Sequence, residues 1–285
     1  MYEAHYKLTR DPFRLRPRTE VCFQHASYAK ALSYLFYAME KGEGLLLVTG
    51  SPGTGKTTLI RDCVSQTSDS PVQFLEISTG SINGDDLIYL IANKLALPID
   101  GIRKVAMLAN IEKTLRKVVD KGQKTVLLID EAQSLGNEAL DEVKNLANLE
   151  YRSSPLMQIF LVGQTSLKQR LQSSELSQVL QRVTAACELK PMAEGDMRSY
   201  IEHCLRESGW SGLPKIAGDI VPSLFFNTGG IPRRVNLICG RLLLRGMVQD
   251  QEQLEESDLE AVVQDLREEG LLPDISPVSV QSVPS

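Results

Sequence analysis

The sequence contains no apolar run long enough to cross a membrane. No window approaches the roughly 18 consecutive apolar residues that a transmembrane helix needs. The opening residues, MYEAHYKLTRDPFRLRP, also lack the apolar core of a secretory signal peptide. We therefore expect a chain that neither crosses nor enters a membrane by itself.

The sequence also lacks the cysteine spacings that bind metal, although it has five cysteines. They are Cys22, Cys63, Cys187, Cys204 and Cys239. They are odd in number, widely separated, and form no Cys-x-x-Cys or Cys/His pair. This pattern argues against a zinc site or a set of disulfides, and it favours buried thiols in a reducing cytoplasm.

An excess of positive charge is missing as well. The formal net charge is −5 at pH 7, which argues against a surface coated with basic side chains for nucleic acid, although a local basic patch would not show in the total. Apolar material is plentiful, because 42% of the 285 residues are hydrophobic and can fill a core. The length allows one large domain, or a large and a small one.

Four short apolar runs separated by helical patterns indicate an α/β domain. They are GLLLVTG (44–50), VQFLEIS (72–78), TVLLIDE (125–131) and MQIFLVGQ (157–164). Runs of this kind are too short for helices and are typical of strands buried on both faces. Because helix-patterned segments such as DDLIYLIANKLAL separate them, we predict a parallel sheet with helices on both faces.

From about residue 192 the strand-like runs end and helical patterns follow one another. We predict a small all-helical lid domain over residues 192–270, after an N-terminal arm over 1–25 and an α/β domain over 26–191. The last residues, 271–285, are rich in proline and serine and have no long apolar face. We expect this tail to be disordered.

The strongest motif is GSPGTGKT, residues 50–57, which fits G-x-x-x-x-G-K-[ST] at every fixed position. Glycines let backbone N–H groups surround phosphate oxygens, Lys56 adds a positive charge at the β- and γ-phosphates, and Thr57 offers a hydroxyl to Mg²⁺. An apolar strand precedes the loop, and a helix follows with its N-terminus facing the anion. The chain is therefore predicted to bind a nucleoside triphosphate. The predicted binding residues are Gly50, Ser51, Pro52, Gly53, Thr54, Gly55, Lys56, Thr57 and Thr58.

A second motif, TVLLIDEAQ, places Asp130 and Glu131 at the carboxyl end of a strand, where open α/β sheets bind their ligands. We expect Asp130 to hold Mg²⁺ through water and Glu131 to polarise the attacking water. Acidic residues here could instead cap the next helix. Their position downstream of a phosphate-binding loop favours hydrolysis over simple binding.

Two further polar residues in the α/β domain are candidates for the site. Gln164 ends the run IFLVGQ, which should lie beside the Asp130 strand, so its side chain could reach the γ-phosphate or the water. The alternative is that Gln164 is a turn residue after Gly163. Arg182 precedes the last apolar run of the domain, and an isolated arginine at a helix end is usually a surface residue.

The segment GGIPRRVNLICGRLLLRG, residues 229–246, predicts a helix that begins at its proline. At 100° per residue, Arg234 shares a stripe with Arg241 and Arg245. Arg233 lies on the other side, beside Leu237, Gly240 and Leu244. We therefore expect Arg234 at the solvated surface. Arg233 needs an anion, because a guanidinium keeps its charge and is rarely buried unpaired.

Together these motifs resemble the AAA+ ATPases over nearly the whole chain. The resemblance rests on a Walker A loop, a Walker B strand, a polar strand end, an arginine before the last strand and the GGIPRR helix. MYEAHYKLTRDPFRL, EGLLLVTGSPGTGKTTLIR, LLIDEAQSL and FLVGQTSLKQRL are similar to the ExeA/GspA group of bacterial ATPases. This group includes the MshM-type pilus-biogenesis ATPase and ATPases associated with exosortase and exopolysaccharide loci.

The resemblance implies roles for the remaining candidates. Gln164 would be sensor 1, Arg182 the arginine finger, and Arg233 the sensor 2 residue that meets the γ-phosphate of ATP. The pattern of Tyr6, Pro12 and Phe13 matches the Y-x-L-x-x-x-PF start of the group. These residues either pack on adenine or pack against the protein core, and the sequence leaves both open.

The resemblance also implies a Mg²⁺-dependent ATPase that energises or remodels an envelope-assembly complex of the secretion, pilus or exopolysaccharide type. Such a protein would form a head-to-tail homo-oligomer, either a ring or a helix. Longer members continue after the lid into a membrane segment and a peptidoglycan-binding domain, whereas this sequence ends at SPVSVQSVPS. We therefore expect a separate membrane-protein partner, and a chain that is cytoplasmic or peripheral at the inner membrane through that partner.

The alternative function is a DNA-bound AAA+ switch that resembles transposition regulators. The stripe of Arg234, Arg241 and Arg245 would contact DNA, together with the basic segment Arg14–Arg18. The acidic pI of about 5.4 and the closer group resemblance favour the envelope role.

Overall fold

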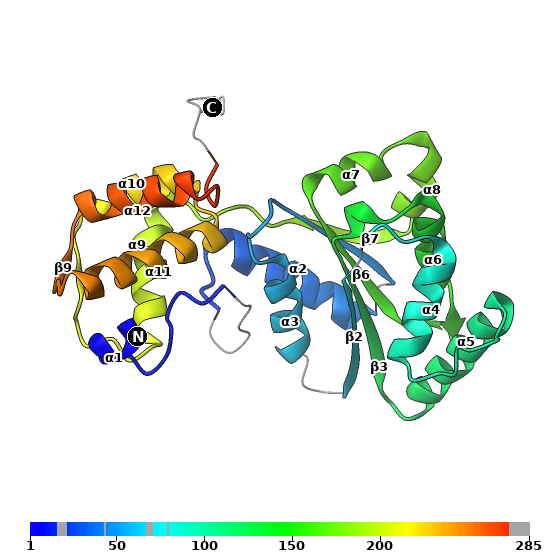
Figure 1. Ribbon diagram of the computed structural model, residues 1–285. Coiled ribbons are helices and arrows are strands. Elements are labelled where there is room, and N and C mark those ends of the chain that lie inside the picture. Colours follow the sequence, from blue (N-terminus) through cyan, green and yellow to red (C-terminus); the bar gives the residue numbers. More distant parts are fainter. Residues whose placement is uncertain (16–21, 43, 67–70, 79, 274–285) are drawn as a thin grey trace. The chain divides into compact units, whose positions relative to one another are not determined.

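The computed structural model describes residues 1–15, 22–42, 44–66, 71–78 and 80–273. The described residues divide into two compact units. Those from 22 to 190 form an α/β unit, and those from 1 to 15 pack with those from 191 onward in a helical unit (Figure 1). Within the described part of the chain, no helix is both long and apolar enough to span a membrane.

The α/β unit is built on a five-stranded sheet in the order β2-β3-β6-β1-β7. Its strands are β1 (Leu45–Thr49), β2 (Val72–Ser78), β3 (Lys124–Asp130), β6 (Gln158–Gly163) and β7 (Val183–Glu188). All neighbouring strands are parallel, which confirms the predicted sheet and places β6 beside β3 as expected. Because Asp130 pairs with Ser78 and Gly163 with Thr49, the carboxyl ends of four strands share one edge.

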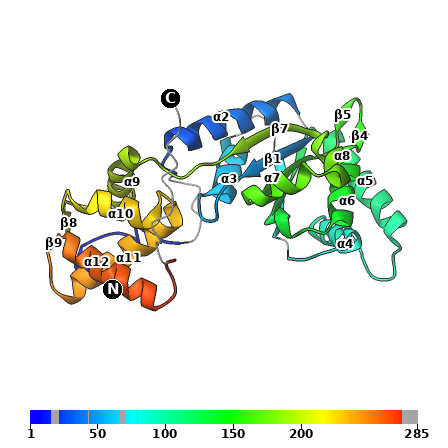
Figure 2. The ribbon, with the colours of Figure 1, turned by 90° about the horizontal axis from the view of Figure 1, so that it is seen from above.

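Helices cover both faces of this sheet (Figure 2). On one face lie α2 (Ala26–Lys41) and α3 (Lys56–Gln66), which pack against Leu46 and Val48. On the other face, the core contains Leu45 and Leu47. It is covered by α4 (Gly84–Lys94), α5 (Lys104–Asp120), α6 (Asn137–Ala147), α7 (Thr165–Leu171) and α8 (Ser177–Leu180). Successive side chains of β1 point to opposite faces, so this short strand supplies both cores.

Short elements complete the α/β unit. The 3₁₀ helix η1 (Ala132–Ser134) follows β3, and η2 (Ser174–Leu176) precedes α8. The antiparallel pair β4 (Glu150–Tyr151) and β5 (Ser154–Pro155) forms a small hairpin after α6. Helix α6 ends at Ala147, before the hairpin begins at Glu150.

Among its described residues, the helical unit has four longer helices, α9 (Glu194–Arg206), α10 (Ile220–Thr228), α11 (Pro232–Val248) and α12 (Glu256–Glu268). It also contains two short parallel strands that the sequence did not indicate, β8 (Lys215–Ile216) and β9 (Gln253–Leu254). They form because the segments before α10 and α12 run side by side, with Ala217 N–H donating to Leu254 O at 3.1 Å. The lid is therefore mainly, but not wholly, helical.

The N-terminal segment packs into the helical unit. After the short helix α1 (Tyr2–His5), Thr9 N–H donates to Ser208 O at 2.9 Å, and the Tyr6 hydroxyl donates to Gln251 O at 3.1 Å. At the other end of the chain, Leu272 is buried in the same unit. The rest of the predicted tail, residues 274–285, and residues 16–21 of the predicted arm lie outside the described residues.

Candidate nucleotide-binding site

The phosphate-binding loop joins β1 to α3, and its backbone requires glycine. Gly53 and Gly55 have φ angles of 82° and 96°, in the region that side chains disfavour. At Gly50 the restriction is steric as well, because a Cβ there would lie 2.4 Å from the carbonyl oxygen of Leu189. The Thr54 hydroxyl donates to Ser51 O at 2.9 Å and braces the turn. The glycines of the motif are thus explained by backbone geometry.

Lys56 begins α3 and is the buried cation of the loop, with only 7% of its surface exposed. Its Nζ donates to Gly50 O at 3.0 Å and to Ser51 O at 3.1 Å. Burial lowers the pKa of Lys56, and the nearby carboxylates of Glu131 and Asp130 oppose that shift. The ammonium group therefore lies against the loop backbone, where a phosphate would also be held.

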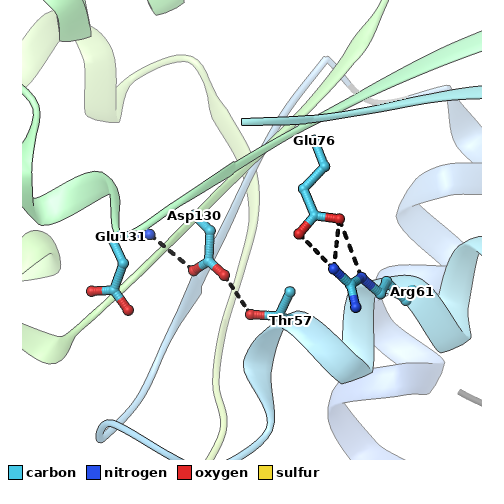
Figure 3. Close-up of polar contacts among 5 residues, drawn as sticks. All are labelled: Thr57, Arg61, Glu76, Asp130 and Glu131. Carbon is cyan, nitrogen blue, oxygen red and sulfur yellow. Dashed lines mark hydrogen bonds and ion pairs between the residues drawn. The ribbon is translucent and has the colours of Figure 1, made fainter. Parts of the chain in front are cut away.

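Thr57 and Asp130 join the loop to the end of β3 (Figure 3). The Thr57 hydroxyl donates to Oδ2 of Asp130 at 2.5 Å, while Oδ1 of Asp130 accepts the N–H of Glu131 at 2.9 Å. A hydroxyl and a carboxylate side by side are oxygen donors of the kind that Mg²⁺ prefers. The residues present fit the ion that the sequence predicts.

Glu131 directly follows β3 in an unusual backbone conformation. Its φ is 55°, in the left-handed region that non-glycine residues seldom occupy, and its side chain is exposed. Such outliers concentrate at functional sites. Gln133 Nε2 donates to Glu131 Oε2 at 2.5 Å. The carboxylate therefore stands at the strand edge, held by a neighbouring side chain.

Gln164 follows β6, the strand that lies between β3 and β1 in the sheet. It is the N-cap residue of α7, and its backbone N–H donates to Oε1 of Gln133 at 3.0 Å. The structure thus brings Gln164 to the same edge as Asp130, Glu131 and the phosphate-binding loop. This position is consistent with the predicted sensor and with the alternative of a turn residue.

Arg182 lies at the opposite end of the sheet. It is exposed and immediately precedes β7, where Val183 pairs with Leu45 at the start of β1. The phosphate-binding loop follows Thr49 at the other end of β1, about 16 Å away at the usual rise of a strand. Arg182 is therefore not brought together with Lys56 of its own unit.

Arg233 lies on the predicted side of α11, but the exposure expected for the two arginines of this helix is wrong. Arg233 is exposed, whereas Arg234 is half-buried. The core-facing residues of α11 are Val235, Ile238, Cys239, Leu242, Leu243 and Gly246. Arg233 lies on the opposite side, with Leu237, Gly240 and Leu244, and this second apolar stripe is only partly covered. Arg233 belongs to the helical unit, so the α/β site as described does not include it.

Pro12 and Phe13 are also in the helical unit, and both are buried there. Only 3% of Phe13 is exposed, and a Cβ at Gly240 of α11 would lie 3.9 Å from the Phe13 Cβ. Asp11 Oδ1 accepts the N–H of Phe13 at 2.9 Å. These contacts favour packing against the protein core. Contact of Pro12 and Phe13 with adenine stays a prediction.

Two polar networks near the site were missed from the sequence. In the first, Arg61 of α3 makes a bidentate contact with Glu76 of β2, with Nη2–Oε distances of 2.6 and 2.7 Å (Figure 3). In the second, Arg170 of α7 donates to the backbone oxygens of Gln133 and Leu135 at 3.1 and 2.6 Å. These contacts join segments that are distant in the sequence, so no local pattern reveals them.

Comparison with known proteins agrees with this geometry. Residues 39–171 match the family model described as "AAA domain". The chain is 31% identical over 274 residues to general secretion pathway protein A of Aeromonas hydrophila, a match that covers 95% of this chain and 50% of that protein. The chain thus spans about half the length of the curated relative it matches.

Solved structures show the same fold at low sequence identity. The ORC2 protein of Aeropyrum pernix, in its ADPNP–ADP complexes, gives a TM-score of 0.69 at 15% identity, covering 90% of this chain and 71% of that chain. Cdc6p of Pyrobaculum aerophilum gives a TM-score of 0.70 at 16% identity, covering 94% and 73%. The chain therefore has the fold of these solved structures, its residues 39–171 match an AAA domain, and it is similar over 95% of its length to general secretion pathway protein A.

Proposed function

We propose that the chain is a Mg²⁺-dependent ATPase that energises or remodels an envelope-assembly complex of the secretion, pilus or exopolysaccharide type. One observation carries the ATPase part: Lys56, Thr57 and Asp130 meet where β1 and β3 end, with Glu131 beside them. The nucleotide complexes of the similar ORC2 protein support a nucleotide ligand for this fold. The name of the relative supports the secretion type of complex.

Each residue at this edge has a role in the proposed reaction. The loop N–H groups and Lys56 bind the phosphates, and Thr57 and Asp130 hold the ion. When bound, Mg²⁺ supplies positive charge that neutralises the phosphate oxygens as charge develops on them. Glu131 accepts the proton of the attacking water, and Gln164 orients that water or the γ-phosphate from the next strand.

The position of Arg182 supports a site completed by a second subunit. An arginine at the far end of the sheet is too distant from its own loop, but a head-to-tail neighbour would receive it at its ATP. Contacts of this kind generate rings or helical filaments. We therefore propose a head-to-tail homo-oligomer in which Arg182 acts in trans and Arg233 acts from the helical unit.

The proposed envelope role implies a partner in the membrane. We propose a membrane protein as that partner, with the chain at the cytoplasmic side of the inner membrane. The match covers only half of the relative, so the relative does not identify the partner of this chain. The partner has to be identified by experiment. Affinity capture with the Glu131→Gln variant, in the presence of ATP, is suited to this purpose because it would hold the ATP-bound form.

The alternative DNA-bound switch is less well supported. Of the arginines in its predicted contact stripe, Arg241 forms an ion pair with Glu269 at 2.7 Å and Arg245 with Asp258 at 3.4 Å. These carboxylates reduce the positive charge that the stripe offers to phosphate. In the other proposed contact, Arg16 and Arg18 lie outside the described residues. Salt-sensitive binding to duplex DNA would revive this alternative.

Phosphate release from ATP, measured with Mg²⁺ and again after its removal by EDTA, tests the proposed activity. We expect turnover that needs Mg²⁺, and a loss of about two orders of magnitude or more in Glu131→Gln, which keeps the side-chain shape but cannot accept a proton. ATP binding should survive in that variant. A folded parent protein without ATP turnover, at concentrations that form its oligomer, would contradict the proposal.

A further inference from the structure

Gln133, in the 3₁₀ helix η1, bridges two parts of the site. Its amide nitrogen donates to the carboxylate of Glu131 at 2.5 Å, and its amide oxygen accepts the backbone N–H of Gln164 at 3.0 Å. Glu131 follows β3, and Gln164 follows β6. One half-buried side chain therefore connects the proposed proton acceptor with the neighbouring strand end.

The chemistry of the two partners fixes the orientation of this amide. The backbone N–H of Gln164 can only donate, so it must face the amide oxygen, and the NH₂ group is left for Glu131. An ionised carboxylate can only accept, so it matches that NH₂ group. Glutamine satisfies both partners at once. Glutamate would lose the donor, and asparagine is one methylene shorter.

The surroundings of Gln133 hold it in this position. The guanidinium of Arg170 donates to Gln133 O and to Leu135 O, and also to the side chain of Asn137. These bonds attach the segment after β3 to α7, the helix that begins after Gln164. The segment that carries Gln133 and the helix that begins after Gln164 are therefore held together.

Gly163 leaves room for the amide. A Cβ at this position would lie 2.7 Å from Oε1 of Gln133 and 2.8 Å from Cδ2 of Leu167, so a larger residue would displace the bridge or the helix. Gly163 is also the last residue of β6, which pairs with Thr49 just before the phosphate-binding loop. The bridge thus passes close to the end of β1.

We propose that Gln133 is a positioning residue for ATP hydrolysis. It holds the Glu131 carboxylate, whose backbone is in the left-handed region, and ties it to the strand end that carries Gln164. The water-activating group and the residue predicted to sense the γ-phosphate are thereby placed as one assembly. This inference rests on the proposed ATPase function and adds a residue to its site.

The sharpest test is Gln133→Glu. This variant keeps the length and the acceptor for Gln164 N–H, but it replaces the donor with a second carboxylate facing Glu131. We expect kcat for ATP to fall about ten-fold or more, because a charge-assisted hydrogen bond is replaced by repulsion. The KM for ATP should stay within about two-fold, because no phosphate contact changes. The matched control is Gln169→Glu, which adds the same charge at an exposed position of α7.

Two further variants separate positioning from a merely structural role. Gln133→Asn keeps the amide but cannot reach both partners, so its kcat should fall in the same way. In the Glu131→Gln background, adding Gln133→Glu should change neither residual turnover nor ATP affinity, because the residue it acts through is already disabled. A further drop in that double variant, or a kcat of either single Gln133 variant equal to or above the parent's, would overturn the positioning role.

The outcomes also distinguish this inference from the function on which it rests. If the parent hydrolyses ATP, Glu131→Gln does not, and Gln133→Glu behaves as the parent, only the role of Gln133 fails. If the parent has no ATPase activity, the proposed function fails and the role of Gln133 fails with it. Thermal unfolding of each variant, compared with Gln169→Glu, shows whether a loss of kcat reflects loss of fold.

Discussion

The hydroxyl of Thr57 donates a hydrogen bond to the carboxylate of Asp130, a residue 73 positions later in the chain. This contact joins the phosphate-binding loop to the neighbourhood of the proposed proton acceptor, because Asp130 also accepts the N–H of Glu131. The two motifs that the sequence presents separately therefore form one site. Substitution of each residue at this site is expected to change a different property of the protein.

Thr57→Val should remove the response to Mg²⁺. Valine has nearly the same shape as threonine but offers no hydroxyl to the ion or to Asp130. We expect the gain in ATP affinity on adding Mg²⁺ to shrink at least several-fold, while binding in EDTA changes little. Titration of ATP with and without Mg²⁺ measures this effect. Thr57→Ser is the control, since it keeps the hydroxyl, and an equal loss in both variants would point to packing instead.

Lys56→Ala should weaken nucleotide binding. The variant removes a buried ammonium group that lies against the loop carbonyls, so affinity for ATP should drop by roughly ten-fold or more. Isothermal titration with the folded variant is the measurement. Lys41→Ala, at the exposed end of α2, is a matched control that should bind as the parent does. If the affinity of Lys56→Ala for ATP is unchanged, the loop is not part of the ATP site.

Arg182→Ala should bind ATP normally and hydrolyse it poorly. An arginine supplied by a neighbouring subunit can contribute about 10³-fold or more to the rate. Arg182→Ala has an intact loop and Lys56→Ala has an intact Arg182, so oligomers that mix the two should regain activity that neither has alone. Mixing the two at a range of ratios and measuring phosphate release tests this. If oligomers shown to be mixed do not recover activity, Arg182 is an ordinary surface residue without a role in hydrolysis.

Arg233→Ala and Arg234→Ala should differ in what they lose. Arg233 is exposed, so its removal should leave the unfolding temperature close to that of the parent while lowering ATP hydrolysis. Arg234 is half-buried, so its removal should affect stability more than turnover. Thermal unfolding and ATPase rates of both variants give the comparison. Equal defects in turnover would show that Arg233 has no special role.

Two thiols of the α/β unit, one buried and one half-buried, should make stability depend on pH. Burial raises the pKa of Cys63 and of Cys187 to about 12, from an ordinary value of 9.0. Below pH 9 both states keep these protons, whereas between pH 9 and 12 the unfolded chain loses them first. The free energy of unfolding should therefore fall as pH rises through this window. Urea unfolding at pH 8 and pH 10 measures the fall, which should be smaller in a Cys63→Ala, Cys187→Ala double variant.

Features that depend on local pattern could be predicted from the sequence. The strand before Gly50 and the strand before Asp130 are short apolar runs with glycine or acid at their ends, and both are where the pattern places them. The adjacency of β3 and β6 also follows from the usual rules of chain order. These signals are carried by neighbouring residues, so tertiary structure is not needed to detect them.

Features that depend on which face of a helix or strand end packs against another element could not be predicted from local pattern. Helix α11 is apolar on two sides, and the sequence does not tell which one faces the core, so the exposures expected for Arg233 and Arg234 are wrong. The bridge of Gln133 requires the ends of β3 and β6 to be adjacent and one side chain to reach both. The pair β8 and β9 is too short to leave a periodic pattern.

The close approach of Gly50 to Leu189 links nucleotide binding to the way the chain leaves the α/β unit. Leu189 follows β7, is fully buried, and donates its N–H to Thr49 O at 2.8 Å, while its carbonyl oxygen occupies the space a Cβ would need at Gly50. The covalent connection to the helical unit begins two residues later, at residue 191. If the loop backbone shifts when a phosphate binds or leaves, Gly50 would therefore push against Leu189, just before the connection to the helical unit. The loop that is proposed to hold the phosphates is thus in direct contact with the residue from which the chain continues to the helical unit.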